Sequence, residues 1–111
     1  MEVEFSSPFG GETRTRLLVA LRLLDESYPR ELSRLLGVSL SSVQKALRSL
    51  ELDGLVAVRT MGRTRLAQID PRYFARRELI AYLGRLAQAD RKLAVAAAEL
   101  RRRPRRTGKP L

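Results

Sequence analysis

Six hydrogen-bonding residues lie along one side of the helical pattern at residues 40–52. Their hydroxyl, amide, ammonium and guanidinium groups can all donate a hydrogen bond, and no carboxylate interrupts them before Glu51. The amide of Gln44 can pair with adenine, and Lys45 or Arg48 can bind guanine or a phosphate. The other three are serines, whose short side chains allow a close approach to such a partner. The six residues are Ser41, Ser42, Gln44, Lys45, Arg48 and Ser49.

A helix–turn–helix arrangement is predicted to position these side chains. The first helix covers about residues 29–36 and begins at Pro29, which suits a first helical turn. Gly37 can adopt the positive φ that ends a helix, and Ser39 is a good N-cap for the second helix at about 40–52. The apolar residues of the second helix face away from the six polar residues and are expected in the core. They are Val43, Ala46, Leu47 and Leu50.

A β-hairpin is predicted directly after the second helix. The runs at 55–60 and 64–69 are rich in β-forming residues and flank a loop that contains Gly62. Leu66 and Ile69 do not share a face of a regular strand, so the pattern leaves open a bulge or an early strand end. Three arginines in the hairpin are placed to bind phosphates or a minor groove. They are Arg59, Arg63 and Arg65, of which Arg63 is the best placed.

The remaining apolar residues predict two further helices. One covers about residues 12–26, and the other starts at Asp70 and Pro71 and continues until Pro104 stops it. The second carries an a/d heptad repeat, which favours self-association, and a polar residue in the repeat can set its register. Folding back of this helix onto its own domain is the competing interpretation. The repeat is formed by Leu79, Leu83, Leu86, Asp90, Leu93, Ala97 and Leu100.

The charge balance favours a polyanionic partner. The 111 residues include 22 Lys and Arg against 12 Asp and Glu, which gives a net charge of +10. Because there is no Cys and no His, thiolate and histidine catalysis and Cys- or His-based metal sites are excluded, and we expect no enzyme, metal or cofactor. No stretch approaches the roughly 20 apolar residues of a membrane-spanning helix. The acidic start of the chain is unlike a signal peptide, so we expect a cytoplasmic protein without membrane contact.

A known family carries the same pattern. The stretch "RELSRLLGVSLSSVQKALRSLELDGLV" followed by "RTMGRTRLAQI" resembles the winged helix-turn-helix of transcriptional regulators, with ArsR-like and MarR-like proteins as the nearest relatives. The resemblance implies a mainly α fold in which residues 40–52 are the recognition helix and 56–69 the hairpin wing. ArsR-type metal sensing uses Cys and His ligands, which this chain lacks. The predicted segments are an irregular lead-in at 1–11, a winged helix-turn-helix domain at 12–70, a long dimerisation helix at 71–103 and a flexible basic tail at 104–111.

The resemblance implies a homodimer that binds double-stranded DNA sequence-specifically, with repression by occluding a promoter as the default mode. Arg30 and Arg34 of the first short helix are weaker candidates for backbone contacts. A plain solvated surface would also be polar, but it usually carries Glu or Asp. Two other functions stay open: a protein-interaction module or DNA-targeting partner of, for example, a nucleotidyltransferase or toxin, and a non-specific nucleic-acid binder. The sequence leaves any small-molecule effector, and the role of the tail in DNA binding, undetermined.

Overall fold

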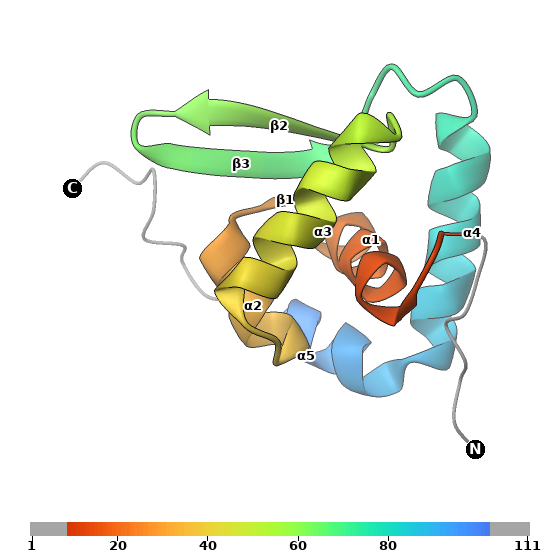
Figure 1. Ribbon diagram of the computed structural model, residues 1–111. Coiled ribbons are helices and arrows are strands. Elements are labelled where there is room, and N and C mark those ends of the chain that lie inside the picture. The colour runs from red at the N-terminus through yellow and green to blue at the C-terminus, as the bar shows by residue number, and fades with distance from the viewer. Residues whose placement is uncertain (1–8, 103–111) are drawn as a thin grey trace.

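The computed structural model describes residues 9–102, and within them the chain forms five helices and one three-stranded antiparallel sheet (Figure 1). The predicted mainly α fold with a hairpin wing is confirmed. The predicted basic tail and most of the predicted lead-in lie outside these residues. The elements are α1 (Glu12–Leu24), β1 (Glu26–Ser27), α2 (Pro29–Leu36), α3 (Leu40–Leu52), β2 (Val56–Met61), β3 (Thr64–Ile69), α4 (Arg76–Ala89) and α5 (Arg91–Arg102).

Helix α1 is the centre of the core. Its residues from Leu17 to Leu21 are fully buried in succession, because α2, α3, α4, α5 and β3 all pack against it. A helix that is apolar on every side in this way must be surrounded by other elements. Figure 1 shows α3 crossing in front of α1, α4 along one side and α5 beneath it. None of the described helices is both long and apolar enough to cross a membrane.

The helix–turn–helix has the predicted geometry. Gly37 adopts a φ of 68°, and its N–H donates to the carbonyl of Ser33 at 2.9 Å. The Ser33 hydroxyl donates to the carbonyl of Val38 at 2.6 Å, which closes the turn a second time. Ser39 caps α3 by accepting a hydrogen bond from the N–H of Ser42 at 3.1 Å. The turn is therefore fixed by local hydrogen bonds that the sequence already encodes.

The sheet has the strand order β1-β3-β2. Strand β1 was not predicted, because its two residues are too few to show a period. It exists because α1 ends at Leu24, two residues earlier than expected, and Asp25 takes a φ of 72°. Strands β2 and β3 pair regularly from Met61↔Thr64 to Val56↔Ile69, so neither the bulge nor the early strand end occurs. Gly62, at a φ of 64°, opens the two-residue loop.

The start of the C-terminal helix differs from the prediction. Asp70 and Pro71 do not begin it, because the Asp70 carboxylate accepts from the N–H of Arg72 at 2.8 Å and the Asp70 carbonyl from the N–H of Tyr73 at 3.1 Å. An aspartate that bonds its own backbone two residues on forms a turn. Helix α4 therefore begins only at Arg76.

The expectation of one long C-terminal helix is also wrong. Asp90 has a φ of −113° and a ψ of 78°, which ends α4, and its carboxylate accepts from the N–H of Leu93 at 3.1 Å, which caps α5. Helix α5 turns back and packs on α1 and α2. The heptad residues are consequently used inside the chain. Leu79 (7% exposed), Leu83 (0%), Leu93 (2%) and Ala97 (1%) are buried, and Leu86, Asp90 and Leu100 are half-buried.

Candidate nucleic-acid interface

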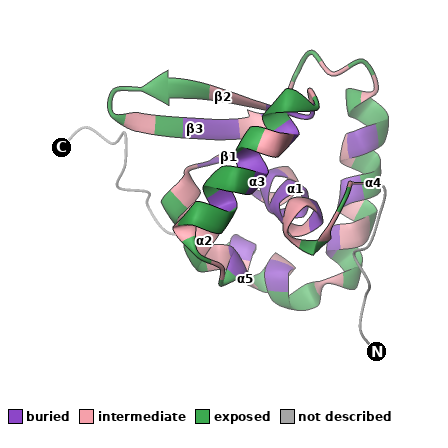
Figure 2. Ribbon diagram, viewed as in Figure 1, coloured by how far each residue is buried: buried purple, intermediate pink, exposed green. Residues whose placement is uncertain are grey.

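The outer face of α3 carries most of the predicted polar residues together. Ser41, Gln44, Lys45 and Arg48 are all exposed, and on the opposite side Val43, Ala46, Leu47 and Leu50 are buried in the core. Figure 2 shows the front of α3 as a largely exposed surface beside the projecting hairpin. The buried side fixes which side chains point outward, so the donor groups form one continuous row along the helix.

All three predicted serines form hydrogen bonds within the protein. The hydroxyl of Ser41, which is exposed, lies 3.2 Å from the hydroxyl of Ser39. Ser42 is exposed, but its hydroxyl accepts a hydrogen bond from Ser39 at 2.9 Å. Ser49 is half-buried and accepts a hydrogen bond from Arg14 of α1. Ser49 is thus at the edge of the exposed face and faces α1. The exposed row continues instead to Leu52, which is 82% exposed and was not predicted as part of the site.

The wing arginines do not share one face of the hairpin. Arg59 pairs in register with Leu66, while Arg65 pairs with Thr60, and successive residues of a strand point to opposite sides. Arg59 and Arg65 therefore lie on opposite faces, with Arg63 in the loop between the strands. All three are exposed. Within residues 9–102, neither Arg63 nor Arg65 forms an ion pair.

Arg59 is held by β1. Its Nη2 lies 3.4 Å from Oε1 of Glu26, and the two side chains are 54% and 44% exposed. An exposed pair of this kind contributes at most about 1 kcal/mol to stability. Its importance is that a carboxylate neutralises one of the three wing cations. The missed strand β1 is the reason that the sequence did not show this pair.

We expect Glu26→Gln to tighten DNA binding by about two- to threefold at low salt, because it frees Arg59 for a phosphate. Binding would be measured by fluorescence anisotropy with a labelled duplex. Glu78→Gln is the matched control, since it removes an exposed acid of α4, away from the wing. Equal tightening in both variants would show that the change in net charge, and not the release of Arg59, is responsible.

Two acidic residues of the helix–turn–helix, Glu31 and Asp53, have partners within the protein. The Ser27 hydroxyl donates to Oε1 of Glu31 at 2.6 Å, and Asp53 forms an ion pair with Arg14 at 2.7 Å. Arg30 and Arg34 of α2 are exposed and add positive charge beside the turn.

No group of three or more acidic side chains in the described part of the chain is placed to hold a metal ion.

An exposed helix held by a helix–turn–helix and followed by an arginine-bearing hairpin defines a winged-helix DNA-binding domain. Residues 12–72, more than half of the chain, match the family described as "Sugar-specific transcriptional regulator TrmB". The chain belongs to this TrmB family of transcriptional regulators. The resemblance to winged helix-turn-helix regulators is thereby confirmed, with TrmB as the family that is shown. No curated protein sequence matches the chain.

Solved structures of regulators have the same fold. A variant of ZitR from Lactococcus lactis is 18% identical, with a TM-score of 0.61 over 90% of this chain and 65% of that one. HlyU from Vibrio cholerae, in its reduced form, is 30% identical, with a TM-score of 0.52 over 68% of this chain and 75% of HlyU. The adhesin competence repressor AdcR from Streptococcus pyogenes is 17% identical, with a TM-score of 0.53 over 81% of this chain and 66% of AdcR. The chain thus spans about two thirds of the length of ZitR and AdcR.

Proposed function

We propose that this chain is a sequence-specific DNA-binding repressor of the cytoplasm, which reads the major groove with the outer face of α3. The observation that carries the proposal is the exposed row of Ser41, Gln44, Lys45 and Arg48 on a helix whose other side is locked into the core. A helix presented in this way fits the major groove, where Gln pairs with adenine and Arg or Lys with guanine. The TrmB family membership supports the same function.

The wing has a different role in this proposal. Arg63 in the loop and Arg65 on the strand would contact phosphates or the adjacent minor groove while α3 reads base edges. The family match covers the winged helix and the first residues after it, 12–72. It therefore supports DNA binding by this part of the chain, and it assigns no sugar site to it.

We propose that the DNA-bound form is a homodimer. Two α3 helices related by a two-fold axis would read half-sites about 34 Å apart on a pseudo-palindrome. Residues outside the heptad series would form the dimer contact, because most residues of that series are buried within the chain. Phe74, which precedes α4 and is 92% exposed, is the most exposed large apolar side chain in residues 9–102 and is available for such a contact.

Selection of bound duplexes from random DNA tests the function directly. We expect enrichment of two inverted half-sites separated by one helical turn, and a complex whose mass by analytical ultracentrifugation corresponds to two chains on one duplex. A single enriched half-site with one chain per duplex would overturn the dimer and leave specific binding intact. Recovery of no preferred sequence, with a steep salt dependence, would replace the proposal by non-specific binding through the net charge of +10.

The wing assignment makes a separate prediction. Arg63→Ala should weaken binding by about five- to tenfold at low salt, similarly for selected and unrelated duplexes, because a phosphate contact carries no sequence information. The slope of log K against log salt should fall in magnitude by about 0.9, the value for one lost phosphate contact. Arg77→Ala, an exposed arginine of α4, is the matched control. Equal effects of the two variants would show that Arg63 of the wing does not contact the DNA.

A further inference from the structure

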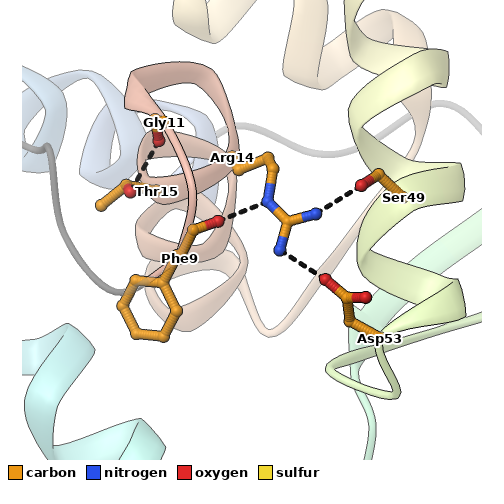
Figure 3. A network of polar contacts seen from close by, with 6 residues as sticks. All are labelled: Phe9, Gly11, Arg14, Thr15, Ser49 and Asp53. Atoms are coloured by element: carbon orange, nitrogen blue, oxygen red, sulfur yellow. Dashed lines mark hydrogen bonds and ion pairs between the residues drawn. The ribbon is translucent and has the colours of Figure 1, made fainter.

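Arg14 of α1 connects the segment before α1 to the end of α3 through one guanidinium group. Its Nε donates to the carbonyl of Phe9, its Nη1 to the hydroxyl of Ser49, and its Nη2 to Oδ2 of Asp53 at 2.7 Å. Figure 3 shows the group between the segment that precedes α1 and the last turns of α3. The Arg14 side chain is only 21% exposed. These three hydrogen bonds use three of the five N–H groups of the guanidinium.

The backbone around Arg14 is shaped for this contact. Gly10 has a φ of 101°, and a Cβ atom there would lie 3.1 Å from Nε of Arg14, so a larger residue would press on the guanidinium group. Thr15, which is fully buried, donates from its hydroxyl to the carbonyl of Gly11 at 2.7 Å and holds the start of α1. The segment before α1 consequently curls around the arginine and presents the Phe9 carbonyl to it.

The contacts of Arg14 with α3 add a directional constraint to the packing of the buried side of that helix. Burial of apolar side chains is non-directional, whereas a planar guanidinium with several fixed N–H directions orients its partners. Ser49 directly follows Arg48, and Asp53 comes one turn later as the C-cap of α3. A carboxylate at the C-terminal end of a helix is unfavourable next to the helix dipole. Pairing with Arg14 explains why an aspartate is tolerated there.

We propose that Arg14 is a positioning residue for DNA reading: the core sets which face of α3 points outward, and the hydrogen bonds of Arg14 to Ser49 and Asp53 restrict the remaining rotation of α3, so that Gln44 and Arg48 stay aimed at base edges. Arg14 itself does not touch the DNA. The inference rests on the proposed function of α3 and adds a residue from outside the helix–turn–helix that sets its specificity.

Asp53→Asn separates this inference from simple electrostatics by its effect on the ratio of specific to non-specific affinity. Loss of a negative charge alone would tighten binding to every duplex by the same factor and leave the ratio of specific to non-specific affinity unchanged. A loosened α3 lowers that ratio instead. We expect the ratio to fall by about threefold in Asp53→Asn and by about tenfold in Arg14→Ala, measured with a duplex recovered by selection and an unrelated duplex. An unchanged ratio in both variants would overturn the proposal.

The salt dependence shows whether Arg14 contacts the DNA. Loss of a positioning residue leaves the slope of log K against log salt unchanged, whereas loss of a phosphate contact reduces its magnitude by about 0.9. A reduced slope in Arg14→Ala would therefore also overturn the proposal. Arg14→Lys should behave like Arg14→Ala in the affinity ratio, because the three acceptors are bound by three separate nitrogen atoms of the guanidinium group and the single nitrogen of a lysine cannot reach all of them.

A structural control and a fallback complete the test. Arg22→Ala removes another half-buried arginine of α1, which donates to the carbonyl of Ile80 in α4, and not to α3, at 3.1 Å. We expect its affinity ratio to equal that of the wild type. If Arg14→Ala does not fold, Ser49→Ala decides: a lower ratio supports the positioning role, and an unchanged ratio rejects it. Absence of any preferred duplex for the wild type would instead reject the proposed function.

Discussion

Replacement of Gln44 and Arg48 together by alanine should lower affinity for the selected duplex by about 100-fold, and affinity for an unrelated duplex by less than about tenfold. Each side chain can make a bidentate contact with a base, and such a contact is worth about 1–3 kcal/mol of discrimination against the wrong base. Both side chains are exposed, so their removal leaves no cavity in the core. The melting temperature of the free protein is therefore expected to stay unchanged.

Glu51→Ala is the matched control for this double variant. It lies on the same helix and is exposed, but it is acidic and follows the donor row. We expect it to bind the selected duplex at least as tightly as the wild type. Affinity is measured by anisotropy on the same duplex. If the folded double variant binds as tightly as the wild type, the outer face of α3 does not read the DNA sequence.

Leu93→Ala should lower the free energy of unfolding by about 2–5 kcal/mol, as for other leucines deleted from a protein core. The side chain is 2% exposed and lies in the cluster that includes Leu17, Leu21 and Leu83. The heptad interpretation makes a different prediction, because a leucine at a dimer seam would act mainly on association. Denaturant unfolding at several protein concentrations distinguishes the two: core packing gives the same loss relative to the wild type at each concentration.

Val95→Ala provides the comparison within the same helix. Val95 is two residues from Leu93 but is 62% exposed, so its truncation should change stability by no more than about 0.5 kcal/mol. A variant Leu93→Ala that keeps wild-type stability and loses only self-association would show that α5 does not pack as described. Equal losses in Leu93→Ala and Val95→Ala would contradict the different burial of the two side chains.

Local signals allowed the helix–turn–helix and the hairpin to be predicted from sequence. Pro29, Gly37 and Ser39 act on their own neighbours, through the first turn of α2, a φ of 68° and an N-cap. Gly62 likewise determines the hairpin loop by its positive φ. Such effects depend on a few adjacent residues, so the pattern in the sequence is sufficient to place them.

The features that were predicted wrongly or missed all depend on contacts between distant residues or on a choice between two local structures. Asp70 and Asp90 are both N-cap residue types, but Asp70 forms a turn and Asp90 caps a second helix inside a continuous apolar period. The period cannot show the bend, because α5 keeps the same spacing after it. The contacts of Arg14 with Ser49 and Asp53 join residues 35 and 39 positions apart, and no local sequence pattern indicates such contacts.

Because of the bend at Asp90, the surface of α1 and α2 is covered by the α5 of the same chain. With helical torsion angles at that residue, α4 and α5 would form one rod about 40 Å long. The surface of α1 and α2 that α5 now covers would then be open, and the α5 of a second copy could make the same contacts there. Reciprocal helix exchange of this kind would bury the same surfaces of α1 and α2 and would link two copies. The conformation of a single residue thus separates a self-contained fold from an intertwined pair.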